Sequence, residues 1–466
     1  MKLIIDSSLK LLDAPKDVTD WFIEQLTFNN PKFEEAMKYG RYTNSIRQYI
    51  KLYRRLPNGI VLPRGFLQII EDSIIGQGLN ISIKDNRILT PPISISSNIK
   101  LRPYQRGAKF NLLSHPNGML VAPAGSGKTI MGLDLFASVR QSMLWLTHTN
   151  RLSNQVIERI IGTDDHPPAF SDITRDEIGF IGGGKMKLGD RITIGMIPTL
   201  VRRKDELLAI GKKFGIVIID EAHHVPASTF LEVISYFSSY YLYGLTATPY
   251  RRDKLENVMF ATIGLPNAKV AREEVKKLGS IITPIVVKRI VPSEKWEGND
   301  FPYIITELLL TNELRLSMIV QDIHREATKG NYCIVINTRK QYCEMILETL
   351  LPYWDKAVIA TGDYSRKHNN EQVEKIERGE ATVLITTFEL LGEGFDVPKL
   401  NRGFIALPFR EKTRVEQAVG RIQRACEGKK DAIIYDYVDE NIGILKNQFM
   451  HRAMTYRLLG MKIIDG

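Results

Sequence analysis

Residues 122–129, Ala-Pro-Ala-Gly-Ser-Gly-Lys-Thr, constrain this chain more than any other stretch. They fit a pattern of four variable residues followed by Gly-Lys-Thr, with alanine in place of the usual first glycine. Gly125 and Gly127 allow backbone N–H groups to approach a phosphate without an intervening Cβ. The apolar run Met119–Ala122 predicts a buried strand before the loop, and residues 130–139 predict a helix after it. This order of elements predicts a phosphate-binding loop.

The polar residues that end this loop indicate which ligands it takes. Lys128 is expected to reach the β and γ phosphates of a nucleotide, and Thr129 to offer its hydroxyl to Mg²⁺. The helix that opens at Thr129 points its positive end at the same anion. We therefore predict that a nucleoside triphosphate and Mg²⁺ are the cofactors, and that the remaining cofactor-binding residues of the loop are Ala124, Gly125, Ser126 and Gly127.

The overall composition is that of an ordinary globular protein. Of the 466 residues, 44% are hydrophobic and 25% are charged, so two or three domains with large cores are expected. A formal net charge of +10 favours a polyanionic partner, although many basic proteins have none. No apolar run reaches membrane-spanning length, and the apolar start of the chain is too short for a signal peptide, so we expect no membrane association.

The three cysteines, Cys333, Cys343 and Cys426, lack the spacing of metal ligands. Their odd number argues against a disulfide framework. We expect buried or bystander thiols in a reducing compartment, and hence a cytoplasmic protein, in the host cytoplasm if a phage encodes it.

The first 95 residues carry no nucleotide signature. Residues 18–26 predict a helix, and residues 59–63 and 79–83 read as strands. The segment 36–70 contains seven cations, no acidic residue and four tyrosines: Lys38, Arg41, Arg47, Lys51, Arg54, Arg55 and Arg64, with Tyr39, Tyr42, Tyr49 and Tyr53. Cations neutralise phosphates and aromatic faces stack on bases, so the segment is a candidate nucleic-acid surface. A solvated basic face with tyrosines that pack inward explains it equally well.

From residue 99 the chain becomes a regular alternation of strands and helices, after a Pro- and Ser-rich stretch at 91–98 that predicts a linker. Apolar runs that alternate with helical stretches predict a parallel sheet covered on both faces. The expected strands are Met143–Thr147, Arg191–Gly195, Phe214–Ile219 and Tyr241–Leu245. About 17 residues before the phosphate loop, Gln105 is placed to read an adenine edge, and Arg102 beside it is a further cofactor-binding candidate.

An acidic pair follows the strand expected at 214–219. Asp220 at the strand tip can hold the Mg²⁺ that Thr129 also contacts, and Glu221 can orient and deprotonate the attacking water. His223 is a candidate for relaying the nucleotide state to the Thr-rich turn at Thr246–Pro249.

A second α/β set follows a change of texture around residues 279–300. Its expected strands are Tyr332–Ile336, Ala357–Ala360, Thr382–Thr386, Gly403–Leu407 and Asp431–Tyr435, without a second phosphate loop. The run Gln417–Arg424 predicts a helix on which Arg421 and Arg424, three residues apart, share one face. Such a pair can supply charge to a γ-phosphate across a cleft during phosphoryl transfer, with Gln417 in the same catalytic motif.

Taken in order, these motifs resemble a superfamily 2 helicase or translocase over residues 99 to 440. The motifs are Leu-Arg-Pro-Tyr-Gln105, Gly-Lys-Thr129, Leu-Thr-His-Thr-Asn-Arg-Leu152, Asp-Glu-Ala-His223, Thr-Ala-Thr248, Thr-Thr-Phe-Glu-Leu-Leu-Gly-Glu-Gly-Phe-Asp396 and Gln-Ala-Val-Gly-Arg-Ile-Gln-Arg424. The resemblance implies two RecA-like domains with ATP in the cleft, and nucleotide contacts from Gly394 and Asp396. It also implies contacts to the nucleic-acid backbone from Thr147, Arg151, Gly182, Gly183, Thr338, Arg339 and Thr387.

Two further stretches narrow the resemblance. Gly-Leu-Thr-Ala-Thr-Pro-Tyr-Arg-Arg-Asp253 is similar to the DNA-acting branch that includes restriction motors and XPB-like helicases. Lys-Tyr-Gly-Arg-Tyr42 and Leu-Pro-Asn-Gly-Ile-Val-Leu-Pro-Arg64 are similar to the N-terminal domain of UvsW-like phage helicases, which remodel branched DNA. The Asp-Glu-Ala-His and Thr-Ala-Thr motifs are more standard than the UvsW-like pattern.

We therefore expect an α/β chain with two tandem RecA-like domains, at 96–283 and 284–466, and a small N-terminal α+β accessory domain at 1–95 that binds DNA through Lys38, Arg41, Arg54 and Arg55. The expected activity is an ATP-dependent DNA helicase or translocase on forked, branched or duplex DNA in replication, recombination or repair. We expect a monomer with little sequence specificity. An RNA helicase, or a duplex-translocating subunit of a restriction or repair complex, remains an alternative.

Overall fold

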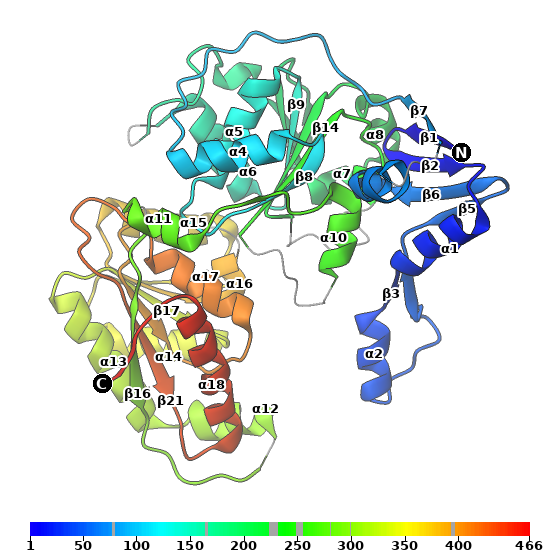
Figure 1. Ribbon diagram of the computed structural model, residues 1–466. Coiled ribbons are helices and arrows are strands. Elements are labelled where there is room, and N and C mark those ends of the chain that lie inside the picture. The colour runs from blue at the N-terminus through cyan, green and yellow to red at the C-terminus, as the bar shows by residue number, and fades with distance from the viewer. Residues whose placement is uncertain are drawn as a thin grey trace. The chain divides into compact units, whose positions relative to one another are not determined.

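The chain divides into two compact units, residues 1–274 and 275–466 (Figure 1). The computed structural model describes residues 1–76, 80–163, 166–222, 232–247, 255–279, 281–298, 300–392 and 397–466. The sequence suggested three domains with boundaries at residues 95 and 283. In the structure the N-terminal region groups with the first α/β domain, and the units divide at residue 274.

An eight-stranded sheet forms the centre of the first unit. In order across the sheet, its strands are β11 (Lys185–Lys187), β10 (Gly179–Gly182), β12 (Ile192–Met196), β9 (Met143–Thr147), β13 (Ile216–Asp220), β14 (Tyr241–Thr246), β8 (Asn117–Val121) and β15 (Ala268–Lys269). Neighbouring strands are parallel except β10 and β11. Every residue of β9, β12 and β13 is buried, as expected for strands that helices cover on both faces.

The helices of this α/β layer are α4 (Pro103–Leu113), α5 (Lys128–Val139), α6 (Asn150–Ile161), α7 (Ile197–Leu200), α8 (Lys204–Ile210) and α10 (Glu256–Ile263). α5 is apolar along most of its length and buries Met131, Leu133 and Phe136. Its Gly132 lies against β9, because a Cβ there would come within 2.6 Å of the Trp145 ring. Helix α5, which begins where the phosphate loop ends, therefore lies at the core of the first RecA-like domain.

A five-stranded sheet at the N-terminus packs on this domain. Its strands are β5 (Arg54–Leu56), β6 (Gly59–Pro63), β2 (Ser8–Leu12), β1 (Lys2–Ile5) and β7 (Ser82–Asp85). They are accompanied by α1 (Lys16–Gln25), α2 (Pro31–Lys38) and a two-stranded antiparallel sheet of β3 (Thr27–Asn29) and β4 (Tyr49–Lys51). Gly65 approaches α10 so closely that a Cβ would lie 2.3 Å from the Phe260 carbonyl oxygen. Ala261 of α10 also belongs to the N-terminal core. This tight packing explains why both regions form one unit.

The stretch 91–98, which the sequence suggested as a linker, is fixed to the α/β domain at several points. The preceding Thr90 N–H donates to Gln141 Oε1 at 2.6 Å. Within the stretch, the Ser96 N–H donates to Asp172 Oδ1 at 3.0 Å, and the Asn98 N–H to the Ala169 carbonyl at 2.9 Å. The linker interpretation therefore fails for this segment, since a freely jointed connection would lack these bonds.

The second unit contains a seven-stranded sheet in which all neighbouring strands are parallel. Across the sheet the strands are β18 (Ala357–Ala360), β19 (Val383–Thr387), β17 (Cys333–Asn337), β20 (Arg402–Ile405), β21 (Ile433–Val438), β16 (Ile285–Ile290) and β22 (Ile463–Asp465). Its helices include α13 (Glu313–Thr328), α14 (Lys340–Leu350), α15 (Arg366–Arg378), α16 (Phe388–Gly392), α17 (Lys412–Ile422) and α18 (Gly443–Leu458). The two RecA-like domains expected from the sequence are confirmed, with β16 and β22 added.

The C-terminal tail closes the second unit. Arg452 of α18 is buried and donates from Nε and Nη2 to Asp436 of β21 at 2.9 and 2.8 Å, and Tyr456 donates its hydroxyl to the same carboxylate. β22 extends the sheet beside β16. The sequence alone left open whether residues 441–466 close the domain or make a further contact, and the structure favours the first. Within the described residues, no helix is long and apolar enough to span a membrane.

Candidate functional site

The sequence candidates of the first unit meet at one edge of its sheet. The phosphate loop follows β8, Asp220 ends β13, Thr246 ends β14 and Thr147 ends β9. These strands are parallel, so their carboxyl ends share an edge, where ligands of such sheets bind. His223 and Thr248 lie outside the described residues, so the proposed relay between them has no structural description.

Backbone conformation makes the phosphate loop dependent on glycine. Gly125 and Gly127 have φ angles of 82° and 81°, in the left-handed region that side chains with a Cβ rarely adopt. A Cβ on Gly127 would also lie 2.6 Å from Nε2 of Gln105. Helix α5 begins directly after it at Lys128, and no side chain of the described residues caps its first turn. The N–H groups of that turn remain suited to an anion.

Helix α4 supports the loop from one side. Tyr104 Oη and Gln105 Nε2 donate to the carbonyl oxygen of Ser126 at 3.0 and 2.8 Å, and all three residues are buried. The Gln105 Oε1 accepts from the N–H of Arg102 at 2.8 Å, which fixes the amide orientation. The side chain expected to read adenine thus uses one donor to hold the loop and its oxygen to accept from the N-cap residue of its own helix. The support from Tyr104 was missed, since a tyrosine early in a helix gives no sequence signal.

Lys128 and Glu221 face each other at the end of the loop. Lys128 Nζ lies 3.5 Å from Glu221 Oε1 and donates to the Ala122 carbonyl at 3.3 Å. Glu221 has a φ of 48°, which is strained for a residue with a Cβ. Strain of this kind persists where the surroundings impose it and clusters at functional sites.

Asp220 is buried beside this pair, with 5% of its surface exposed. Burial, followed by the negative charge of Glu221, raises the pKa of the Asp220 carboxyl to about 7, while Lys128 opposes the shift. A buried acid next to a second acid is poorly compensated, and a cation at this position would relieve it.

The residues present fit a nucleoside triphosphate with a divalent cation. The Ser126 hydroxyl is buried, and no described residue bonds it. Thr129 follows Lys128 in the uncapped first turn of α5, and Asp220 supplies an oxygen for a hard cation such as Mg²⁺. Among the described residues there is no cluster of three His, Cys, Asp or Glu side chains that could hold a metal ion.

The second unit separates the two arginines that the sequence placed on one helical face. Gln417 and Arg421 lie on α17, which ends at Ile422, so Arg424 lies beyond the helix in a bridge with Ile281. Arg421 Nη2 donates to the Leu391 carbonyl at 2.8 Å. The expectation of a shared face is wrong because the helix stops two residues early. Gly394 and Asp396 lie outside the described residues.

Comparison with known proteins places the chain in a family. Residues 98–251 match the family described as type III restriction enzyme, res subunit, and residues 315–426 match the helicase conserved C-terminal domain. Together the two matches span more than half of the chain. The chain belongs to the superfamily 2 helicases.

Individual relatives agree with this placement. The DNA 3'-5' translocase XPB2 of Sulfurisphaera tokodaii is 27% identical over 77% of this chain and 86% of its own. The Escherichia phage T5 protein described as "Probable helicase D10" is 25% identical over 84% of this chain and 83% of its own. The S. cerevisiae Dbp5 structure shares the fold with a TM-score of 0.57 at 15% identity, over 79% of this chain and 90% of Dbp5. The match to the structure of T4 UvsW covers 100% of this chain and 100% of UvsW at 17% identity, but its TM-score of 0.42 supports no further conclusion.

The helicase exposes some of its candidate nucleic-acid contacts and buries others. Thr147 and Thr387 are buried at 0% and 3% exposure, and Gly182 is buried against Met196. The Thr147 hydroxyl is bonded to Ser153 Oγ at 2.7 Å. These buried groups are not available to a nucleic-acid backbone in this structure, contrary to expectation. The candidates that reach the surface wholly or in part are Arg151, Gly183, Thr338 and Arg339.

The basic segment at residues 36–70 is mostly a surface feature. Tyr39 and Tyr42 are 61% and 77% exposed, and Tyr49 is exposed as well, so the interpretation with inward-packing tyrosines is wrong for these three. The exposed cations are Lys38, Arg41, Arg47, Lys51, Arg54 and Arg55. Arg64 is the exception, since it is buried and donates from Nη2 to the Tyr240 carbonyl. Burial lowers the pKa of its guanidinium to about 9, and it belongs to the packing between the N-terminal sheet and β14.

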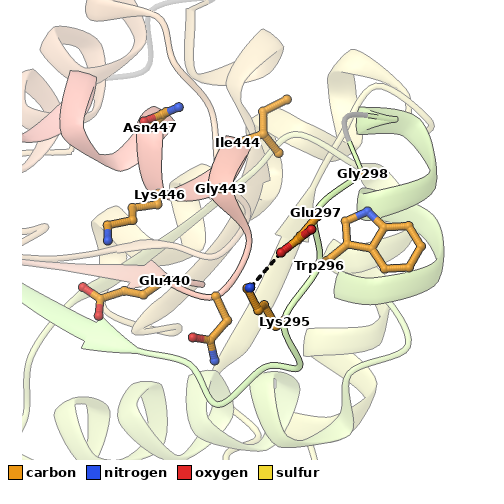
Figure 2. Close-up of a pocket in the computed structure, with 10 residues that line it drawn as sticks. Lys295, Trp296, Glu297, Gly298, Glu440, Gly443, Ile444, Lys446 and Asn447 are labelled. Carbon is orange, nitrogen blue, oxygen red and sulfur yellow. Dashed lines mark ion pairs between the residues drawn. The ribbon is translucent and has the colours of Figure 1, made fainter.

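The second unit also contains a pocket of about 660 Å³ at the carboxyl ends of β16 and β21 (Figure 2). Its lining includes Lys295, Glu297, Glu440 and Lys446. Lys295 and Glu297 form an ion pair at 2.7 Å, and Glu440 pairs with Lys288. The two lysines and two glutamates of this lining carry no net charge together.

Proposed function

We propose that this helicase is an ATP-dependent DNA motor that unwinds or branch-migrates forked and junction DNA in replication, recombination or repair. The observation that carries the proposal is the exposed, acid-free basic segment at residues 36–70, with Tyr39 and Tyr42 at its surface. Cations attract a phosphate backbone, and exposed rings can stack on the unpaired bases that forks provide. The similarity to a DNA translocase supports DNA as the substrate.

The ATP site is assigned to the edge of the first sheet. Gly125, Gly127 and Lys128 would hold the phosphates, and Thr129 with Asp220 would hold Mg²⁺. ATP supplies the phosphoanhydride bond whose hydrolysis drives movement. Glu221 would orient the attacking water and accept its proton, and its carboxylate lies at the end of the loop, 3.5 Å from the Lys128 ammonium.

Further residues complete the proposed site. The remaining hydrogen-bonding capacity of the Gln105 amide suits an adenine edge, with Arg102 at the start of the same helix. Arg421 and Arg424 supply positive charge during phosphoryl transfer. The resemblance also assigns nucleotide or catalytic contacts to His223, Gly394, Asp396 and Gln417.

Nucleic-acid contacts in the two RecA-like domains are assigned to Arg151, Gly183, Thr338 and Arg339. Contacts to a phosphate backbone carry little sequence information. Structure specificity therefore depends on the N-terminal segment.

Steady-state ATPase tests the substrate assignment. Single-stranded, duplex, forked and four-way-junction DNA of matched length are compared with an RNA of equal length, and Lys128→Ala serves as the inactive control. Strongest stimulation by forked or junction DNA supports the proposal. Strongest stimulation by RNA overturns the assignment to DNA.

The N-terminal surface has its own test. The triple variant Arg41→Ala, Arg54→Ala, Arg55→Ala should bind forked DNA more weakly, and the slope of log K against log salt should fall by up to about 3. Lys2, Lys16 and Lys84 are exposed cations of the same region outside the segment, so replacing these three removes the same charge. Equal slopes for both triple variants would show that residues 36–70 do not contact DNA.

A further inference from the structure

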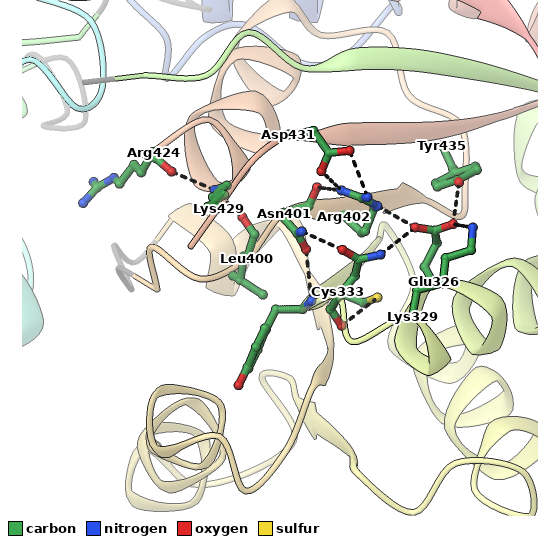
Figure 3. A network of polar contacts seen from close by, with 12 residues as sticks. Glu326, Lys329, Cys333, Leu400, Asn401, Arg402, Arg424, Lys429, Asp431 and Tyr435 are labelled. Carbon is green, nitrogen blue, oxygen red and sulfur yellow. Dashed lines mark hydrogen bonds and ion pairs between the residues drawn. The ribbon is translucent and has the colours of Figure 1, made fainter. Parts of the chain in front are cut away.

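Lys429 lies at the centre of a group of main-chain contacts in the second unit (Figure 3). Its Nζ donates to the carbonyl oxygens of Pro398, Leu400 and Arg424 at 3.1, 2.7 and 2.7 Å. An ammonium group has three N–H donors, so these three carbonyls use all of them. The side chain therefore joins two segments that are more than twenty residues apart in the sequence.

This arrangement has an electrostatic cost. Burial, together with the charges of Arg424 and Arg402, lowers the pKa of Lys429 to about 8, although Cys426 and Asp431 oppose the shift. The three acceptors are neutral carbonyls, so the charge is stabilised by hydrogen bonds rather than by an ion pair. Lys429 is only partly buried, but an ammonium whose three donors are all bonded still restrains the carbonyls that it binds, since losing one acceptor would leave a donor without its partner.

The Arg424 main chain is fixed on a second side as well. Arg424 forms an antiparallel bridge with Ile281, and the N–H of Ile282 donates to the Gln423 carbonyl at 2.7 Å. In the segment that joins α17 to β21, Asp431 accepts from Nη1 and Nη2 of Arg402 at 2.8 and 3.2 Å. The Arg424 guanidinium points away from Lys429 (Figure 3). The main-chain contacts therefore set the place from which this side chain extends.

We infer that Lys429 is a positioning residue for Arg424 in ATP hydrolysis. The inference rests on the proposed role of Arg424 in phosphoryl transfer. Without the helix that the sequence predicted around residue 424, the backbone there lacks the i to i−4 hydrogen bonds that would have fixed it. Lys429 supplies this restraint, and it ties the restraint to Pro398 and Leu400, which closely follow Asp396.

Two single variants provide the first test. Lys429→Met keeps the aliphatic length and removes the three donors, while Lys430→Met changes an exposed neighbour. With saturating forked DNA, we expect kcat for ATP to fall about 10- to 100-fold in Lys429→Met, because a displaced catalytic group loses its alignment. KM for ATP, DNA affinity and the activity of Lys430→Met should stay within about twofold. An unchanged kcat in Lys429→Met would overturn the inference.

A double-mutant cycle separates positioning from a general loss of structure. If Lys429 acts through Arg424, then Lys429→Met should lower kcat no further in an Arg424→Ala background. A multiplicative fall in the double variant would overturn the inference. Lys429→Arg keeps the charge and several donors, so its kcat should lie between those of the parent and Lys429→Met. If Lys429→Arg recovers no activity and the kcat losses of the double variant multiply, Lys429 has a purely structural role.

The same variants distinguish this inference from the proposed function. If Arg424→Ala is inactive and Lys429→Met is fully active, the role of Lys429 fails and that of Arg424 stands. If Arg424→Ala keeps full ATPase activity, the proposed role of Arg424 fails and the inference fails with it.

Discussion

Buried carboxylates in strands, or directly after them, have different partners in the two units. In the second unit, Asp436 binds Arg452 through two hydrogen bonds and also accepts from Tyr456. Asp439 binds Arg315, and both side chains are completely buried. In the first unit, Asp220 is equally buried, yet it lies beside a second acid, Glu221, and the lysine that faces them both is held nearest to Glu221.

This difference distinguishes Asp436 and Asp439, which stabilise the fold, from Asp220, whose charge a bound ligand would compensate. A buried acid paired with arginine has its charge balanced within the protein, so it needs nothing further. The pKa of Asp220 is raised to about 7 because the protein does not fully compensate the negative charge of its buried carboxylate. A site of this kind suits a cation that arrives with its substrate.

Glu221→Gln should have the largest effect. The amide cannot accept a proton from water, so we expect kcat for ATP to fall by about 10²- to 10⁴-fold. Binding of forked DNA, measured by fluorescence anisotropy, should change by less than twofold. Glu206→Gln, at an exposed acid of α8, is the control and should be fully active. Retained ATPase in Glu221→Gln would remove this residue from the proposed chemistry.

Asp436→Asn should have the next largest effect, which is a loss of folding stability. Removing the charge leaves the buried Arg452 guanidinium without its partner, which costs about 3–5 kcal/mol in free energy of unfolding. Thermal and urea unfolding of the full chain would measure this loss in the transition of the second unit. Asp436→Asn combined with Arg452→Met should recover part of the loss. No destabilisation would show that the pair contributes little to this unit.

The same substitution at Asp220, Asp220→Asn, should have the opposite effect and raise the stability of the protein. A folded-state pKa raised from 3.8 to about 7 means that the parent protein loses stability as pH rises through this window, and Asp220→Asn does not. Without nucleotide, the variant should therefore melt higher than the parent at pH 8, and the difference should shrink toward pH 5. The variant should also lose ATPase activity. A lower melting temperature at pH 8 would contradict the comparison.

Lys429 gives the smallest expected effect. Its folded-state pKa of about 8 lies below the ordinary 10.5, so the folded protein releases this proton more easily than the unfolded chain does. The stability of the parent relative to Lys429→Met should rise as pH increases from 8 to 10.5. Urea unfolding at intervals across this range measures the trend, with Lys430→Met as the flat reference. A difference that does not change with pH would indicate an ordinary, solvated lysine.

Much of the fold could be predicted from local pattern. The strands at Gly59–Pro63, Met143–Thr147 and Ala357–Ala360 have the bounds that the sequence predicted, and the other expected strands differ by one to three residues at one or both ends. Gly125, Gly127 and Lys128 were identifiable because a phosphate loop needs glycine at fixed spacing. Such signals lie within a few residues of the chain.

The errors share a physical cause. Arg64 looked like one more surface cation, but the N-terminal sheet packs it against Tyr240, which is distant in sequence. Arg424 looked helical, but the antiparallel bridge to Ile281 replaces the helix after residue 422. The use of Gln105 to hold Ser126 likewise depends on how α4 docks beside the loop. Each of these depends on a partner that the local pattern does not contain.

The sequence by itself determined the α/β class, the phosphate loop and the acidic pair at the end of a strand, because helix and strand periodicity and glycine conformation act over short distances. Only the tertiary structure decided which charges are balanced and which are not. Whether Asp220, Arg64 or Lys429 finds a partner depends on side chains brought together from distant segments, and the cost of burying a charge depends on those neighbours.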